Sequence, residues 1–92
     1  MDAMKIYSEC AADLEAISAL AVTPDHARAR QALAELKSKW DILIKQYKGT
    51  DVEQVLFQAK TRLPNGNTKP DSWHDRLYDA KGDFLFHISI KH

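Results

Sequence analysis

Near the C-terminus the chain reads Asp83-Phe84-Leu85-Phe86-His87-Ile88-Ser89-Ile90-Lys91. From residue 84 onward, large apolar residues occupy every second position, and a period of two is typical of a β-strand. A strand needs a neighbour for its backbone hydrogen bonds, and an isolated two-stranded hairpin is only marginally stable in water. The stretch therefore predicts a strand at 83–91 and at least one further strand upstream.

Two upstream segments are candidates for the further strands. Apolar and polar residues alternate through 54–62, and Asp79-Ala80-Lys81-Gly82 suits a hairpin turn that would join 73–79 to 83–91. Both segments also fit helices. Thr50 and Glu53 have the spacing of a capping box, followed by apolar residues at helical spacing, and Ser72 with Asp75 can begin a short helix. A three-stranded meander pairs the most backbone groups, so we predict strands at 54–62, 73–79 and 83–91.

The first half of the chain predicts two helices. Apolar residues recur at steps of three or four through 3–20 and again through 24–48. Thr23 can cap the second helix, Pro24 suits its first turn, and Gly49 can end it. The connection between the two is short enough to require an antiparallel hairpin. The members of the two stripes are Ile6, Cys10, Leu14, Ile17 and Ala21, then Leu33, Leu36, Trp40, Leu43 and Tyr47.

These patterns predict one α+β domain over residues 1–92. An N-terminal antiparallel helical hairpin (3–48) packs on a small C-terminal antiparallel sheet of two to three strands, within a β-rich part at 54–91. A chain of 92 residues has the size of a single domain with one core.

Composition narrows the class of partner. Thirteen basic residues balance thirteen acidic ones, so no net field attracts nucleic acid, which argues against a nucleic-acid partner. No run approaches the ~20 apolar residues that span a membrane, and the N-terminus lacks the pattern of a signal peptide. A single cysteine excludes an internal disulfide and fits a reducing compartment. We therefore expect a cytoplasmic protein without a membrane partner.

Motifs for catalysis, metal or cofactor binding are missing from the sequence. Cys10 lies on the apolar stripe of the first helix, which predicts a buried structural thiol rather than a nucleophile. His87 and His92 are five residues apart on a predicted strand, so they point to opposite faces. No zinc-binding or phosphate-loop spacing is present among the cysteine, histidines and three glycines. We predict that the protein is not an enzyme and has no catalytic residues, metal site or cofactor.

The strongest candidate site is a cluster after the polar loop at 64–71, consisting of Trp73, His74, Arg76 and Tyr78. Trp, Tyr and Arg are the side chains enriched among interface hot spots. We predict that this patch, or a sheet edge beside it, docks on a larger protein. The function that follows is a non-catalytic protein-binding domain, such as an inhibitor, immunity protein or adaptor, which acts by occluding its partner. A homodimer built on exposed helix surface is a further hypothesis.

The same cluster also supports an alternative. Small metal-independent ribonucleases place Arg, His and Tyr on an antiparallel sheet, where Arg stabilises phosphate charge and His or Tyr moves protons. The chain resembles toxins of the RelE/ParE superfamily in a few short segments. The resemblance implies a ribonuclease that uses Arg76 with His74, Tyr78 or His92, although those toxins are usually strongly basic and this chain is neutral. The segments are Met4-Lys5-Ile6, Ala12-Asp13-Leu14 with Ile17, Arg76-Leu77-Tyr78 and Lys91-His92.

Overall fold

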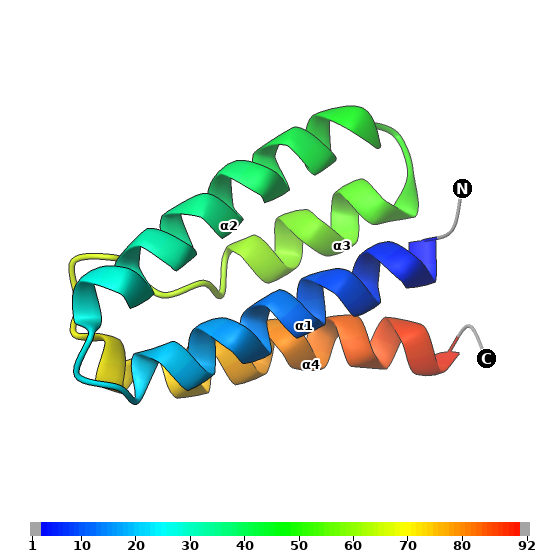
Figure 1. Cartoon of the computed structure of the whole chain (residues 1–92). Coiled ribbons are helices and arrows are strands. Elements are labelled where there is room, and N and C mark those ends of the chain that lie inside the picture. The colour runs from blue at the N-terminus through cyan, green and yellow to red at the C-terminus, as the bar shows by residue number, and fades with distance from the viewer. Residues whose placement is uncertain (1–2, 91–92) are drawn as a thin grey trace.

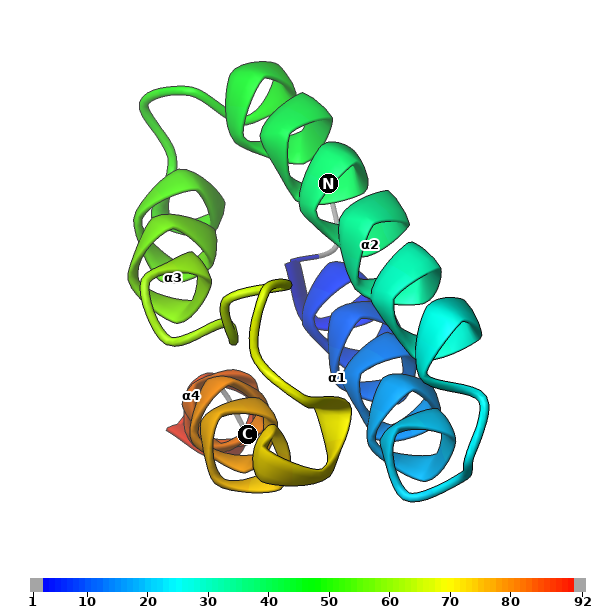
Figure 2. The same cartoon turned by 90° about the vertical axis from the view of Figure 1, so that its left-hand side faces the viewer.

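The computed structural model describes residues 3–90, and this part of the chain consists of helices and the turns between them. Figure 1 shows α1 lying beside α4, while Figure 2 looks along the bundle and shows the four α-helices arranged in a ring. The segment between α3 and the 3-10 helix η1 crosses one end of the ring (Figure 2). The elements are α1 (Ala3–Ala21), α2 (His26–Gln46), α3 (Asp51–Lys60), η1 (Pro70–Ser72) and α4 (His74–Ile90).

The two helices predicted in the first half are present, with small changes at their ends. Asp25, and not Thr23, caps α2, because its Oδ1 accepts a hydrogen bond from the Arg28 backbone N–H at 3.1 Å. Pro24 therefore precedes the cap. Gly49 follows α2 with a φ of 84°, a conformation that favours glycine. α1 and α2 run antiparallel, as the short connection between them required (Figure 1).

The predicted C-terminal sheet, and with it the α+β fold class, is wrong. Within residues 3–90 there is no strand: 54–62 falls in α3 and the turn after it, while 73–79 and 83–90 fall in and just before α4. Lys91, the last residue of the predicted strand, lies outside the described part. No β-hairpin turn exists at 79–82, because these residues are in the middle of α4.

Burial explains why α4 forms a helix. Trp73, Leu77, Ala80 and Phe84 are all buried, at steps of four, three and four, which is the spacing of one helix face. Of the residues that alternate after 83, Phe86 is 62% exposed, so they do not share one buried side of a strand. A helix also pairs its backbone groups internally, which removes the need for a neighbouring strand.

The helical alternative for the middle of the chain is the correct one. The buried residues of α3 are Val52, Val55, Leu56 and Ala59. Thr50 precedes the helix, but its hydroxyl donates to the Tyr47 carbonyl instead of accepting from a backbone N–H of α3. Neither of the two reciprocal hydrogen bonds of the expected capping box is present, because the Glu53 carboxylate accepts from the backbone N–H of Gly49, while the backbone N–H of Thr50 donates to the Tyr47 carbonyl.

Aromatic side chains from three helices meet at the centre of the core. The Phe84 ring stacks on Tyr7 with 5.9 Å between centroids and meets the edge of Trp40 at 5.3 Å. Such pairs contribute about 0.5–1.5 kcal/mol beyond the apolar area they bury. Phe84 therefore links α4 to α1 and α2 at once. Trp40, a member of the apolar stripe predicted for 24–48, is fully buried.

Ion pairs on the surface join neighbouring helices. Lys39 of α2 pairs with Glu9 and Asp13 of α1, and Arg62 after α3 pairs with Asp83 of α4 at 2.8 Å. Exposed pairs of this kind contribute roughly 0–1 kcal/mol each, so they set the register of the helices more than their stability.

Candidate functional site

The structure separates the four residues of the predicted binding patch. Trp73 is only 1% exposed, and its Nε1 donates to the Thr68 hydroxyl at 3.0 Å, so its side chain packs in the core and anchors the preceding loop. His74, Arg76 and Tyr78 are exposed on the first turns of α4. Trp73 therefore offers no surface to a partner in this conformation.

The three exposed residues do not form one surface either. Successive residues of a helix are about 100° apart, so Arg76 and Tyr78 lie on opposite flanks of the buried Leu77. Arg76 borders a hollow beside the 63–72 loop. Tyr78 has the Lys81 ammonium 5.8 Å from its ring centroid, and His74 Nε2 lies 3.1 Å from a carboxylate oxygen of its neighbour Asp75. His74, Arg76 and Tyr78 therefore have separate local contacts and do not form the single patch that was predicted.

A different group of α4 residues gathers on one face. Tyr78, Gly82, Leu85 and Phe86 are spaced by four, three and one residues, which places them along one side of a helix. The three large side chains are exposed, Tyr78 and Phe86 each by more than 60%. We call these four residues the α4 outer face. Their spacing in the sequence becomes a signal only when helical periodicity is applied to 78–86, which the strand assignment prevented.

Gly82 lies at the midpoint of α4, where neither the backbone conformation nor the packing of neighbouring side chains requires a glycine. A Cβ built there meets no atom within 4 Å, and its φ is not positive. Glycine in a helix interior costs about 0.5–1 kcal/mol relative to alanine. Its absent side chain leaves the helix backbone open between Tyr78 and Phe86. The α4 outer face therefore offers large apolar side chains on either side of a site where another chain can approach closely.

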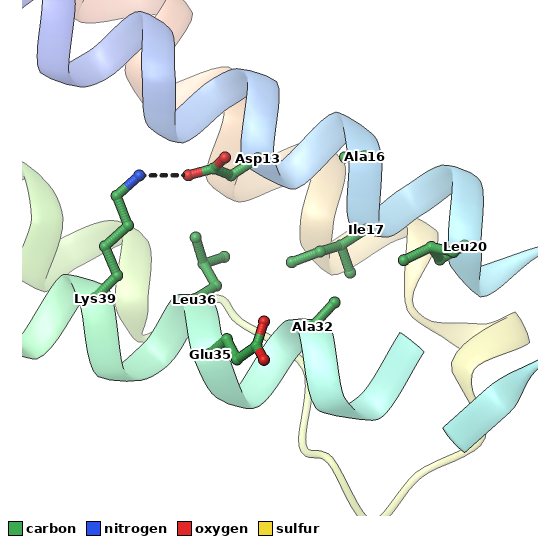
Figure 3. A pocket seen from close by; sticks show the side chains of 8 residues that line it. All are labelled: Asp13, Ala16, Ile17, Leu20, Ala32, Glu35, Leu36 and Lys39. Carbon is green, nitrogen blue, oxygen red and sulfur yellow. Dashed lines mark hydrogen bonds and ion pairs between the residues drawn. The ribbon is translucent and has the colours of Figure 1, made fainter. Parts of the chain in front are cut away.

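A groove of about 270 Å³ lies between α1 and α2. Figure 3 shows Ile17 and Leu20 of α1 facing Ala32 and Leu36 of α2, with the ion pair of Lys39 and Asp13 at one end. Partial burial favours a lower pKa for Lys39, but its hydrogen bonds to Glu9 and Asp13 outweigh this effect and raise it. The two carboxylates thus keep the Lys39 ammonium charged, and its ion pairs join α1 and α2 at this end of the groove.

Residues with catalytic potential are few in the described part of the chain. Cys10 is buried, and burial raises its pKa to about 12, so the thiolate that would act as a nucleophile is disfavoured. Among residues 3–90, no three His, Cys, Asp or Glu side chains are grouped so that they can hold a metal ion. No helix in the same range has the length and apolar character needed to cross a membrane.

Comparison with protein families, with curated proteins and with solved structures gave no significant match to this chain.

Proposed function

We propose that this chain is a non-catalytic protein-binding domain that docks on a larger protein through the α4 outer face. The observation that carries the proposal is the gathering of Tyr78, Leu85 and Phe86 on one side of α4 around Gly82. Of the other exposed large apolar side chains in residues 3–90, Ile90 lies at the end of α4, one helical turn after Phe86. The rest lie on or beside other elements, Val22 after α1, Ile42 on α2 and Phe57 on α3. A contiguous apolar patch is more informative than such scattered residues.

The proposed docking mode is an amphipathic helix in a groove. Partners of this kind recognise apolar anchors that recur at helical spacing along one face, and Tyr78, Leu85 and Phe86 are three such side chains at positions i, i+7 and i+8. Aromatic anchors supply large buried areas at low cost in side-chain entropy, and Tyr is enriched at hot spots. If the groove is the partner's active site or ligand-binding site, docking occludes it and inhibits the partner, as an immunity protein or an inhibitory adaptor does.

The matched pair Phe86→Ser and Phe57→Ser tests the proposal. The two phenylalanines are 62% and 61% exposed, so both substitutions remove the same surface group, one on the α4 outer face and one on α3. Extracts of the source cells are passed over the immobilised wild type and each variant, and the retained proteins are quantified by mass spectrometry. The affinity of any candidate is then measured with purified components.

We expect at least one protein to bind the wild type and Phe57→Ser equally and to bind Phe86→Ser at least tenfold more weakly, because a hot-spot truncation costs at least about 2 kcal/mol. A partner that is lost with Phe57→Ser and retained with Phe86→Ser would contradict the proposal. A homodimer built on the α4 outer face would also contradict it. Light scattering would then give the molar mass of a dimer for the wild type and of a monomer for Phe86→Ser.

We further propose that the protein works in the cytoplasm, supported by its single, unpaired and buried cysteine. The ribonuclease alternative is not carried forward. It required a sheet to display Arg76, His74 and Tyr78 together, and residues 3–90 contain no strand. His92, its fourth residue, lies outside the described part of the chain.

A further inference from the structure

A polar hollow of about 520 Å³ lies between α2, the loop after α3 and the first turn of α4. In Figure 2 this loop crosses one end of the bundle. The polar side chains that line the hollow are Lys37, Asn65, Thr68, Ser72 and Arg76. Two of them are cations, and none of the described residues that line the hollow is Asp or Glu. The lining therefore carries a local positive charge, although the whole chain is neutral.

Neither cation of the hollow is neutralised by a carboxylate within residues 3–90. The ion pairs in that range use other cations, namely Lys39, Lys60, Arg62 and His74. The Lys37 ammonium donates to the Pro64 carbonyl at 3.0 Å, and since Pro64 also lines the hollow, the ammonium is held at its wall. Arg76 is exposed. Asp71 and Asp75, which are close to Arg76 in the sequence, do not line the hollow. Both positive charges are thus available to an anion from outside the fold.

Side chains from outside the loop hold the wall of the hollow in place. Arg30 Nε of α2 donates to the Gly66 carbonyl at 3.2 Å, and Trp73 Nε1 donates to the Thr68 hydroxyl at 3.0 Å. The Thr68 hydroxyl in turn donates to the Asn65 carbonyl at 2.7 Å. A site that is already formed in the free protein binds its ligand at a lower entropic cost. These contacts therefore favour a binding site over a loop that rearranges.

The hydrogen-bonding groups of the hollow favour a phosphate group. Arg76 presents a planar fork of donors that matches phosphate oxygens, and the Lys37 ammonium has two further N–H donors besides the one on Pro64. The hollow also lies at the N-terminal end of α4, where the helix dipole favours negative charge. Two cations match the nearly two negative charges of a phosphate monoester at neutral pH. The Asn65 amide and the Ser72 hydroxyl can bind polar groups of the remaining part of such a ligand.

We propose that this hollow binds a small phosphate monoester, whose phosphate group is received by Arg76 and Lys37 and whose polar organic part is received by Asn65 and Ser72. Arg76 and Tyr78 lie on opposite flanks of α4, so the hollow is separate from the α4 outer face. Either proposal can therefore fail without the other.

The test uses the full chain with glycerol phosphate, inorganic phosphate, glycerate and glycerol, at constant ionic strength and at about pH 7.5, where a phosphate monoester carries nearly two charges. Binding is followed by NMR through the two indole N–H signals, because Trp73 lines the hollow whereas Trp40 is in the core. We expect saturable shifts of the Trp73 signal with glycerol phosphate, weaker binding of inorganic phosphate and glycerate, and no shift with glycerol. The Trp40 signal should stay in place.

Two results would contradict the proposal. If glycerol phosphate gives no saturable shift of the Trp73 signal, the hollow is not a binding site. If inorganic phosphate or glycerate binds as tightly as glycerol phosphate, the assignment to a phosphate monoester is wrong.

Two variants and one control connect binding to the named cations. Arg76→Gln and Lys37→Gln each remove one positive charge, and the new amide at position 37 can still donate to the Pro64 carbonyl. Arg28→Gln is the control, because Arg28 is an exposed cation of α2 that does not line the hollow. We expect roughly tenfold weaker binding of glycerol phosphate for each of the two variants and a change below about twofold for the control. If Arg28→Gln weakens binding as much as Arg76→Gln, net charge alone explains it and the hollow is not the site.

Discussion

Replacing Gly82 by alanine tests the helical structure of the C-terminal part through its energy. Gly82 is eight residues from either end of α4, and an added Cβ contacts nothing within 4 Å. The substitution therefore brings neither a clash nor new packing, and its effect reduces to the difference in helix propensity. That difference is about 0.8–1 kcal/mol in favour of alanine. For a chain of 92 residues the melting temperature should rise by about 4–5 °C.

The assay is urea unfolding followed by circular dichroism, with Gly49→Ala as the control. Gly49 has a φ of 84°, where alanine is strained, so this second variant should lose about 1 kcal/mol of unfolding free energy. The two glycine variants should thus move in opposite directions with an unchanged dependence on urea. If Gly82→Ala is destabilised as much as Gly49→Ala, residue 82 adopts a positive φ in a turn, and an uninterrupted α4 is refuted.

Three other substitutions or conditions test the core and the surface. Trp73→Ala should lower the unfolding free energy by about 3–5 kcal/mol in urea titrations, because Trp73 is buried, whereas a loss below about 1 kcal/mol would mean that its side chain is on the surface. Cys10 should resist a thiol reagent at about pH 8 and react only as urea unfolds the chain, because burial raises its pKa to about 12; rapid labelling of the native protein would contradict this. The hydrogen bond from Lys39 lowers the pKa of Glu9, so their pairing stabilises the fold above the ordinary carboxyl pKa of 4.5 and loses this effect as pH falls through the lowered value. Lys39→Met should therefore lose less stability than the wild type between about pH 6 and pH 3, and equal losses would count against the pair.

The first two helices could be predicted because each has only one periodicity. The apolar residues of 3–20 and of 24–48 recur at helical spacing, and Gly49 ends the second helix with a positive φ. The cap of α2 was predicted two residues early because Thr23 and Asp25 are both good capping residues. Only the geometry shows that Asp25 accepts the hydrogen bond and that the Thr23 hydroxyl donates to the Leu20 carbonyl at 2.6 Å.

The C-terminal helix could not be predicted in the same way because its residues satisfy two periods. Phe84 and Ile88 are two steps of two apart and also one helical turn apart, so the same residues fit a strand and a helix. Phe and Ile favour strands, and Gly82 suits a turn. The stripe from Trp73 through Leu77 to Phe84 decides for the helix, and it becomes visible only when residues before 83 are read together with those after.

The candidate site depended on that choice. Composition identified Trp73 and Tyr78 as residues suited to an interface, but composition does not determine burial, and Trp73 lies in the core. Once 74–90 is a helix, Tyr78 aligns with Leu85 and Phe86 across Gly82. The complete burial of Tyr7 had no sequence signal, because it depends on side chains of other helices, such as Phe84 of α4, that pack against its ring.

The α4 outer face exists only if α4 is a single helix from His74 to Ile90, and NMR of the free protein tests this most directly. We expect an unbroken series of Hα(i)–HN(i+3) nuclear Overhauser effects through 74–90, including Gly82, together with contacts from the Phe84 ring to Tyr7 and Trp40. Close Hα–Hα contacts between 73–79 and 83–90, the mark of an antiparallel hairpin, would contradict it.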